Sequence, residues 1–105
     1  MPKITVTVEP EDPELFRVRL VEDRYVRVHH VWVRRPVLDL LGQGAPAPVV
    51  VETAVRAILE RDPEARLPAR VELSELADQN PFIADELRRR LGEPPPERPG
   101  PPEVA

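Results

Sequence analysis

The stretch Phe16-Arg17-Val18-Arg19-Leu20-Val21-Glu22-Asp23-Arg24-Tyr25-Val26-Arg27-Val28 decides how this chain folds. Apolar and charged side chains alternate on both sides of a short polar break, and this period of two is typical of a half-buried β-strand. The pattern predicts two neighbouring strands, over 15–22 and 25–34, joined by a tight turn. The length of that turn fixes the face on which each side chain of the second strand lies, because a slip of one residue inverts them all.

An odd-length turn gives the simplest apolar face. A two-residue turn at Asp23-Arg24 would place Leu20 opposite Arg27 and mix apolar and charged residues on one face. A three-residue turn over 22–24 pairs even-numbered residues with even-numbered residues, and we therefore expect an odd turn. The shared apolar face would then consist of Phe16, Val18, Leu20, Val26 and Val28. The parity becomes ambiguous at His29-His30, where a β-bulge would explain the irregularity.

The residues before this stretch predict one more strand. Apolar residues occupy the even positions and polar residues the odd positions over 3–8, which again is the pattern of a half-buried strand. Two prolines and four acidic residues follow between Glu9 and Glu14, and they favour a loop. The first third of the chain therefore predicts a three-stranded antiparallel meander.

The residues after the meander favour helices. The segment 36–42 predicts a single short turn closed by Gly42, and 43–47 a linker. The segment 48–61 carries the apolar spacing of an amphipathic helix, with Pro48 in its first turn and Asp62-Pro63 as its end. Its apolar stripe comprises Val51, Ala54, Val55, Ile58 and Leu59.

Two shorter helices are predicted after an extended segment over 66–73. Ser74 is expected to cap a helix over 75–79. Asn80-Pro81, an N-cap followed by proline, is expected to open a helix over 81–91. Acidic residues near the start of that helix and arginines near its end agree with the helix dipole.

These elements predict an α+β fold, in which two to three helices cover one face of a three-stranded antiparallel meander. Helices 48–61 and 81–91 should cover the even-numbered face. The expected contacts join Val51, Val55, Ile58, Phe82, Ile83 and Leu87 to Val6, Val18, Leu20 and Val28. The sheet would keep two free edges, and self-pairing into a homodimer would cover one of them.

The chain length and its prolines favour one small domain over 1–92 followed by a tail. The chain has 105 residues and 15 prolines, of which six lie between Pro94 and Pro102. A segment so rich in proline and without apolar periodicity predicts a disordered or polyproline-like tail over 93–105.

The side-chain chemistry argues against an enzyme. The sequence has no cysteine and a single serine, Ser74, for which helix capping is a sufficient role. The only two histidines, His29 and His30, are adjacent, so on a strand they point to opposite faces and cannot chelate one metal unless a bulge turns them together. Catalytic zinc also usually needs three protein ligands. The four glycines form no phosphate-binding loop. We therefore expect no catalytic residues, no metal site and no cofactor.

An arginine-rich sheet face is the one candidate binding surface. The net charge is −4, so the overall charge does not favour nucleic acid. The segment 14–36, however, holds six arginines and three acidic residues. With the expected odd turn, the odd-numbered face would present Arg17, Arg19, Tyr25, Arg27 and His29. Such a face could bind phosphates and bases, could form a protein interface, or could be an ordinary solvated strand face.

The functional hypothesis is therefore a non-enzymatic protein-interaction or regulatory module, with a protein or a second copy as partner. The alternative is a small nucleic-acid-binding regulator of the antitoxin-like kind that uses the arginine-rich face. The sequence shows neither a secretion signal nor a stretch apolar enough for a membrane span, so a cytoplasmic, membrane-free location is expected. Fourteen arginines against one lysine favour a bacterial source with a GC-rich genome or a thermophilic one.

The C-terminal half also resembles a group of small bacterial proteins that have no assigned activity. The segment 51–63 is similar to the "fLLEREP" helix of that group. Leu73-Ser74-Glu75-Leu76, Asn80-Pro81-Phe82-Ile83 and Glu86-Leu87-Arg88 resemble the segments that follow it. The resemblance covers about Val49–Leu91 and implies an α+β domain without implying an activity.

Overall fold

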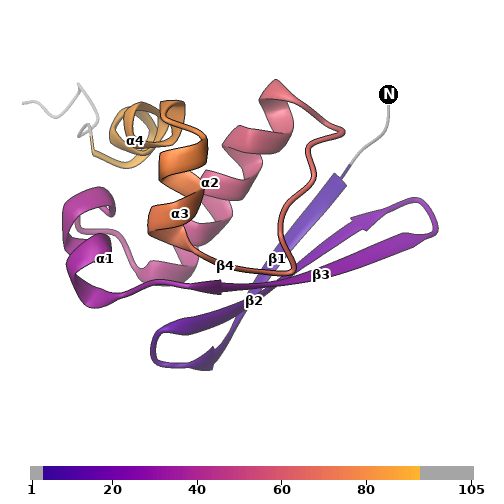
Figure 1. The fold of residues 1–105 in the computed structure, drawn as a ribbon, viewed down its shortest axis with the longest axis horizontal. Helices are drawn as coiled ribbons and strands as arrows, with labels where there is room; N and C mark the ends of the chain where they lie inside the picture. The colour runs from indigo at the N-terminus through magenta and orange to yellow at the C-terminus, as the bar shows by residue number, and fades with distance from the viewer. Residues whose placement is uncertain (1–3, 93–105) are drawn as a thin grey trace, which may run out of the picture.

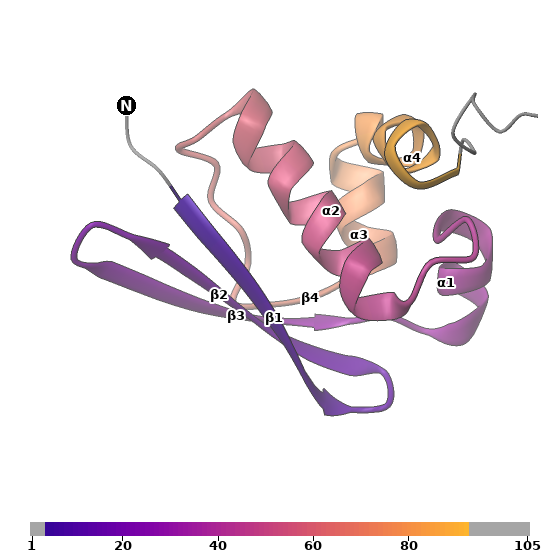
Figure 2. The ribbon, with the colours of Figure 1, turned by 180° about the vertical axis from the view of Figure 1, so that it is seen from behind.

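The computed structural model describes residues 4–92 and shows an α+β fold, as the sequence predicts (Figure 1). A sheet forms one layer, and the helices lie together on one side of it, as Figure 2 shows from behind. In chain order the described elements are β1 (Ile4–Asp12), β2 (Leu15–Glu22), β3 (Tyr25–Trp32), α1 (Arg35–Leu41), α2 (Ala47–Arg61), β4 (Arg70–Glu72), α3 (Leu73–Gln79), α4 (Phe82–Leu87) and the π-helical turn η1 (Arg88–Gly92). The tail predicted over 93–105 lies outside the described residues.

The strand order β1-β2-β3-β4 confirms the antiparallel meander and extends it by one strand. β4 lies parallel to β3, where Val71 pairs with Val31. This strand comes from the segment that we expected to be extended without a sheet partner. A parallel neighbour needs a crossover connection, and α1 and α2 supply it.

The loop expected over 9–14 is shorter than predicted, because β1 continues to Asp12. Glu9 stays in the sheet opposite Arg17, and the acidic residue therefore has a cationic neighbour across the strand pair. A bulge between Pro10 and Asp12 ends the regular pairing. Only Pro13 and Glu14 remain for the turn. The prolines and acidic residues of this segment therefore predicted a longer loop than the structure contains.

The expected odd-length turn between β2 and β3 is wrong. Glu22 pairs with Tyr25, so the turn is the two residues Asp23 and Arg24, and Leu20 lies opposite Arg27. Asp23 has a φ of 52°, a left-handed conformation that Asp tolerates better than most residues. Even-numbered residues of β2 therefore share a face with odd-numbered residues of β3. The core takes His29 and Val31 from β3, and it does not take Val26 or Val28.

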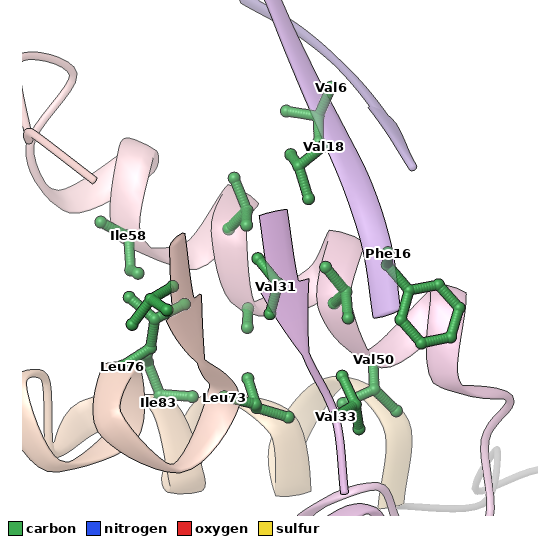
Figure 3. Close-up of a cluster of buried hydrophobic side chains, with 14 of the residues drawn as sticks. Val6, Phe16, Val18, Val31, Val33, Val50, Ile58, Leu73, Leu76 and Ile83 are labelled. Atoms are coloured by element: carbon green, nitrogen blue, oxygen red, sulfur yellow. The ribbon is translucent and has the colours of Figure 1, made fainter. Parts of the chain in front are cut away.

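The core lies between the sheet and the helices (Figure 3). From β1 and β2 it contains Val6, Phe16, Val18 and Leu20. The predicted helix residues Val51, Val55, Ile58, Ile83 and Leu87 are buried against them, and Phe82 is partly buried. Val28 does not join this cluster and is 42% exposed. The two-residue turn is the reason, because it turns Val28 to the other face of the sheet.

The longest helix, α2, begins at Ala47 and ends at Arg61, one residue from the predicted start and at the predicted end. Its buried residues include Val51, Ala54, Val55, Ile58 and Leu59, the stripe that the spacing predicts. Within residues 4–92 no helix combines the length and the apolar character that crossing a bilayer requires.

The helix caps differ from the predictions. Glu72, and not Ser74, caps α3: its side chain accepts from the backbone of Glu75, whose carboxylate accepts the backbone N–H of Glu72. Ser74 therefore lies inside the helix. Asn80 ends α3 and donates its side-chain amide to the carbonyl of Leu76, so it does not cap α4 through its side chain. The difference at Ser74 follows from α3 starting two residues early, directly after β4.

Candidate interaction surface

The sheet has one face that none of the described helices covers (Figures 1 and 2). Residues paired across antiparallel strands lie on the same face, so the register assigns each side chain to a side. Val21 pairs with Val26, and Arg19 pairs with Val28, on the side opposite the core. We call this side the open face. Its apolar members are Leu15, Val21, Val26, Val28 and Trp32.

The apolar side chains of the open face reach solvent. Val26 is 58% exposed and Val28 is 42% exposed. Val21 and Trp32 are half-buried. Trp32 borders two shallow hollows, one toward Pro13 and Arg35 and the other toward Arg70 and Glu75. The open face therefore offers accessible apolar area over its β2–β3 half.

The register divides the five residues of the predicted arginine-rich face between the two sides of the sheet. Arg17 and Arg19 lie on the open face, because they pair with His30 and Val28. Tyr25, Arg27 and His29 pair with Glu22, Leu20 and Val18 and therefore point to the helix side. The predicted group of three arginines on one surface is not assembled, and the two-residue turn is the cause.

Acidic neighbours hold the guanidinium group of Arg17. Its Nη2 lies 2.9 Å from Oε1 of Glu9, and its Nη1 lies 3.5 Å from Oε2 of Glu11. The same Glu11 carboxylate lies 3.3 Å from Nε2 of His30. Glu9 and Glu11 belong to the segment that the sequence predicts as a loop. They neutralise Arg17, one of the arginines of the predicted binding face. Arg19, the next residue of β2 on the open face after Arg17, is exposed.

The second histidine of the pair, His29, is a buried polar residue on the helix side, 7% exposed. Its Nδ1 lies 2.9 Å from the carbonyl oxygen of Pro68. A carbonyl only accepts, so Nδ1 carries the proton and donates it. Within residues 4–92, Nε2 is buried without a hydrogen-bond partner. His29 therefore ties β3 to the segment before β4, and His30 lies on the opposite side of the sheet, as adjacent strand residues must.

We next consider which of the described residues could take part in metal binding or catalysis. No group of three or more His, Asp and Glu within residues 4–92 is placed to hold a metal ion. Ser74 lies in the first turn of α3, and both histidines lie on β3. The residues that the sequence reasoning missed are Val26, Val28 and Trp32 of the open face. The signal that could have found them was Asp23, a residue suited to the positive φ of a two-residue turn.

No protein-family model matches this chain, and neither the curated proteins nor the solved structures compared with it give a match.

Proposed function

We propose that this chain is a non-enzymatic protein-interaction or regulatory module of a bacterial cytoplasm, and that the open face is its binding surface. The exposure of Val26 and Val28 on a sheet face that none of the described helices covers is the observation that carries the proposal. Exposed apolar side chains grouped on one face are typical of interaction sites. Trp32 adds an aromatic residue of the kind that protein interfaces favour.

The charges of the open face support a protein partner over a nucleic acid. Arg17 is paired with two carboxylates, and Arg27 lies on the other side of the sheet. A phosphate backbone is bound by several unpaired cations on one surface, and the open face gathers few of them. Its apolar area beside mixed charges fits an interface with an apolar centre and a polar rim.

Capture of partners from a lysate of the source organism tests the proposal. The immobilised wild-type chain is compared with Val26→Glu/Val28→Glu, which places two charges in the apolar centre of the open face. Leu40→Glu is the matched control, because Leu40 is an equally apolar residue of α1 with 75% exposure. All three positions are exposed, so the fold should be kept, and circular dichroism checks this.

We expect the double variant to retain about tenfold less partner, since a lost interface anchor commonly costs more than about 1 kcal/mol. The Leu40→Glu control should bind like the wild type. Equal capture by all three proteins, or no specific capture by the wild type, would contradict the proposal.

A further inference from the structure

The sheet has a long free edge along β1. In the strand order β1-β2-β3-β4 of residues 4–92, β1 has a neighbour on one side only. Figure 2 shows β1 along the near rim of the sheet with α2 above it. This edge is distinct from the open face, because it presents backbone groups and not a layer of side chains.

The hydrogen-bond pattern shows which backbone groups of β1 point outward. Val33 donates its N–H to Glu14 at 2.8 Å, and His30 donates its N–H to Ala69 at 2.7 Å. The backbone groups of the odd-numbered residues of β3 therefore bond to β2. Their partners are the even-numbered residues of β2, so the odd-numbered residues of β2 bond to β1. By the register of β1 and β2, the odd-numbered residues of β1 bond inward. The N–H and C=O groups of Ile4, Val6 and Val8 consequently point away from the sheet.

This part of the edge lacks the features with which natural sheets block edge pairing. Such features are charged residues, prolines, bulges and very short strands. β1 has a proline and a bulge only at its far end, at Pro10 and between Pro10 and Asp12. The five residues Ile4–Val8 are all β-branched and uncharged, which is a composition suited to a strand within a sheet. The other rim, by contrast, ends in the three-residue strand β4.

We propose that a second copy of this chain pairs with β1 through Ile4–Val8, antiparallel, around a two-fold axis at Val6. Val6 then faces Val6 of the second copy, and Ile4 faces Val8 in both directions. These are the residues whose backbone groups point outward, so each donor meets an acceptor. The same edge of each copy is covered by this pairing, so no further copy can add to it. The assembly is therefore a closed dimer with one continuous sheet.

The side chains at this edge agree with a second copy as the occupant. On the helix side, Ile4 and Val8 are only half-buried in the single chain. Ile4 and Val6 also border a small hollow beneath Arg56, Leu59 and Glu60 of α2. A second copy would cover this hollow. On the open side, Thr5 would face Thr7 of the second copy, a cross-strand pair that can form a hydrogen bond.

The charges beside the edge are self-complementary under the same symmetry. Arg56 and Glu60 are one turn apart on α2 and border the hollow at β1. The two-fold axis makes the two α2 helices antiparallel, so Arg56 of each copy approaches Glu60 of the other. Within the single chain Arg56 pairs with Glu52 at 2.9 Å, and Glu60 pairs with Arg90 at 2.6 Å. The dimer would therefore join two existing ion-pair networks.

This inference does not depend on the proposed function. The dimer leaves the open face uncovered and places two copies of it on one side of a continuous sheet. Failure of the dimer would leave the open face as a candidate surface of a single chain, and failure of partner capture would leave the dimer untouched.

Sedimentation equilibrium of the full chain tests the dimer. The wild type should reach twice the chain mass of 11.9 kDa in a concentration-dependent manner. In Thr5→Glu/Thr7→Glu, carboxylates face each other twice across the two-fold axis, and like charges directly opposite are destabilising. Within its own sheet position 7 lies opposite Arg19, so the single chain should keep its fold. We expect the dissociation constant to rise at least about tenfold.

Thr5→Lys/Thr7→Glu is the matched control, because the same symmetry then places a lysine opposite a carboxylate. It should dimerise at least as tightly as the wild type. A wild type that stays monomeric up to about 1 mM, or two double variants with equal dissociation constants, would overturn the proposal.

Amide hydrogen exchange of the wild type gives a test that needs no substitution. The amides of Ile4, Val6 and Val8 should be protected at high concentration and should lose protection on dilution. The amides of Thr5 and Thr7 bond to β2 and should stay protected in both conditions. Fast exchange of the Val6 amide in a sample of dimer mass would show that the two copies meet elsewhere, and would overturn the proposed register.

Discussion

His29 takes its buried position from a turn six residues before it. The two-residue turn at Asp23-Arg24 directs the odd-numbered side chains of β3 to the core side, and His29 is one of them. Its Nδ1 proton is donated to the Pro68 carbonyl at 2.9 Å, which compensates part of the cost of burying the ring. The same turn directs Val28 and His30 outward.

The first prediction compares the two histidines. His29→Ala should lower the free energy of unfolding by about 1–3 kcal/mol, because the Pro68 carbonyl loses its donor and a cavity forms. His30→Ala should change it by less than about 0.5 kcal/mol, since surface substitutions of this kind have small effects. Urea unfolding of both variants measures the difference. Equal effects, or a larger effect at His30, would contradict the observed register.

The second prediction concerns Glu86 and acid. The hydrogen bond from Arg89 lowers the pKa of Glu86 below its ordinary value of 4.5, and Arg90 adds to this effect. Because the folded-state pKa lies below the unfolded one, Glu86 stabilises the fold fully above pH 4.5 and loses this contribution as the pH falls through the lowered pKa.

Glu86→Gln should therefore be less stable than the wild type at neutral pH, and the difference should shrink below pH 4.5. Thermal melting of both proteins across the acid range measures it. A stability difference that stays constant with pH would show that the ionisation of Glu86 does not contribute.

At the scale of the elements, α2 is the helix that the sequence predicts best. Its apolar stripe recurs regularly from Val51 to Leu59, and long periodic segments leave little ambiguity. The short elements were less predictable, because a tertiary contact decides where they begin. α3 starts at Leu73 because the chain leaves β4 at Glu72, a carboxylate that caps the helix. β4 forms because Val71 pairs with Val31 of β3, and no local sequence pattern predicts this long-range pairing.

The candidate surface was harder to predict than the core for the same physical reason. Alternation showed that β2 and β3 each have an apolar and a polar face, and it did not show how the two strands are aligned. Pairing all apolar residues on one face appeared favourable, yet the observed turn leaves Val26 and Val28 outside. A face left partly apolar against this preference is where function, and not stability, is expected to have shaped the sequence.

The third prediction tests the face assigned to α2. Ile58 is 3% exposed and lies in the middle of the buried stripe. Ile58→Ala should lower the free energy of unfolding by about 2–5 kcal/mol, because it removes buried methyl groups and leaves a cavity. Leu40→Ala removes a similar side chain at an exposed site and should cost less than about 0.5 kcal/mol. A loss below about 1 kcal/mol for Ile58→Ala in denaturant unfolding would contradict the packing of α2.

For the molecule as a whole, the fourth prediction concerns nucleic acid. The chain has a net charge of −4, Arg17 is held by two carboxylates, and Arg27 lies apart from Arg19. We expect negligible binding of single-stranded RNA or duplex DNA at physiological salt, and no change in Arg17→Ser/Arg19→Ser/Arg27→Ser. Fluorescence anisotropy at several salt concentrations measures this. Tight wild-type binding that weakens steeply with salt, and whose slope falls in the triple variant, would favour the regulator hypothesis.

The central claim is that the open face is the surface through which this chain meets another protein. A photo-crosslinking amino acid placed at Val28, and for comparison at Leu40, tests it most directly in cells of the source organism. We predict a covalent adduct with a discrete partner from position 28 and none from position 40. Adducts from position 40 alone, or no adduct from position 28 when the chain is folded and expressed, would contradict the claim.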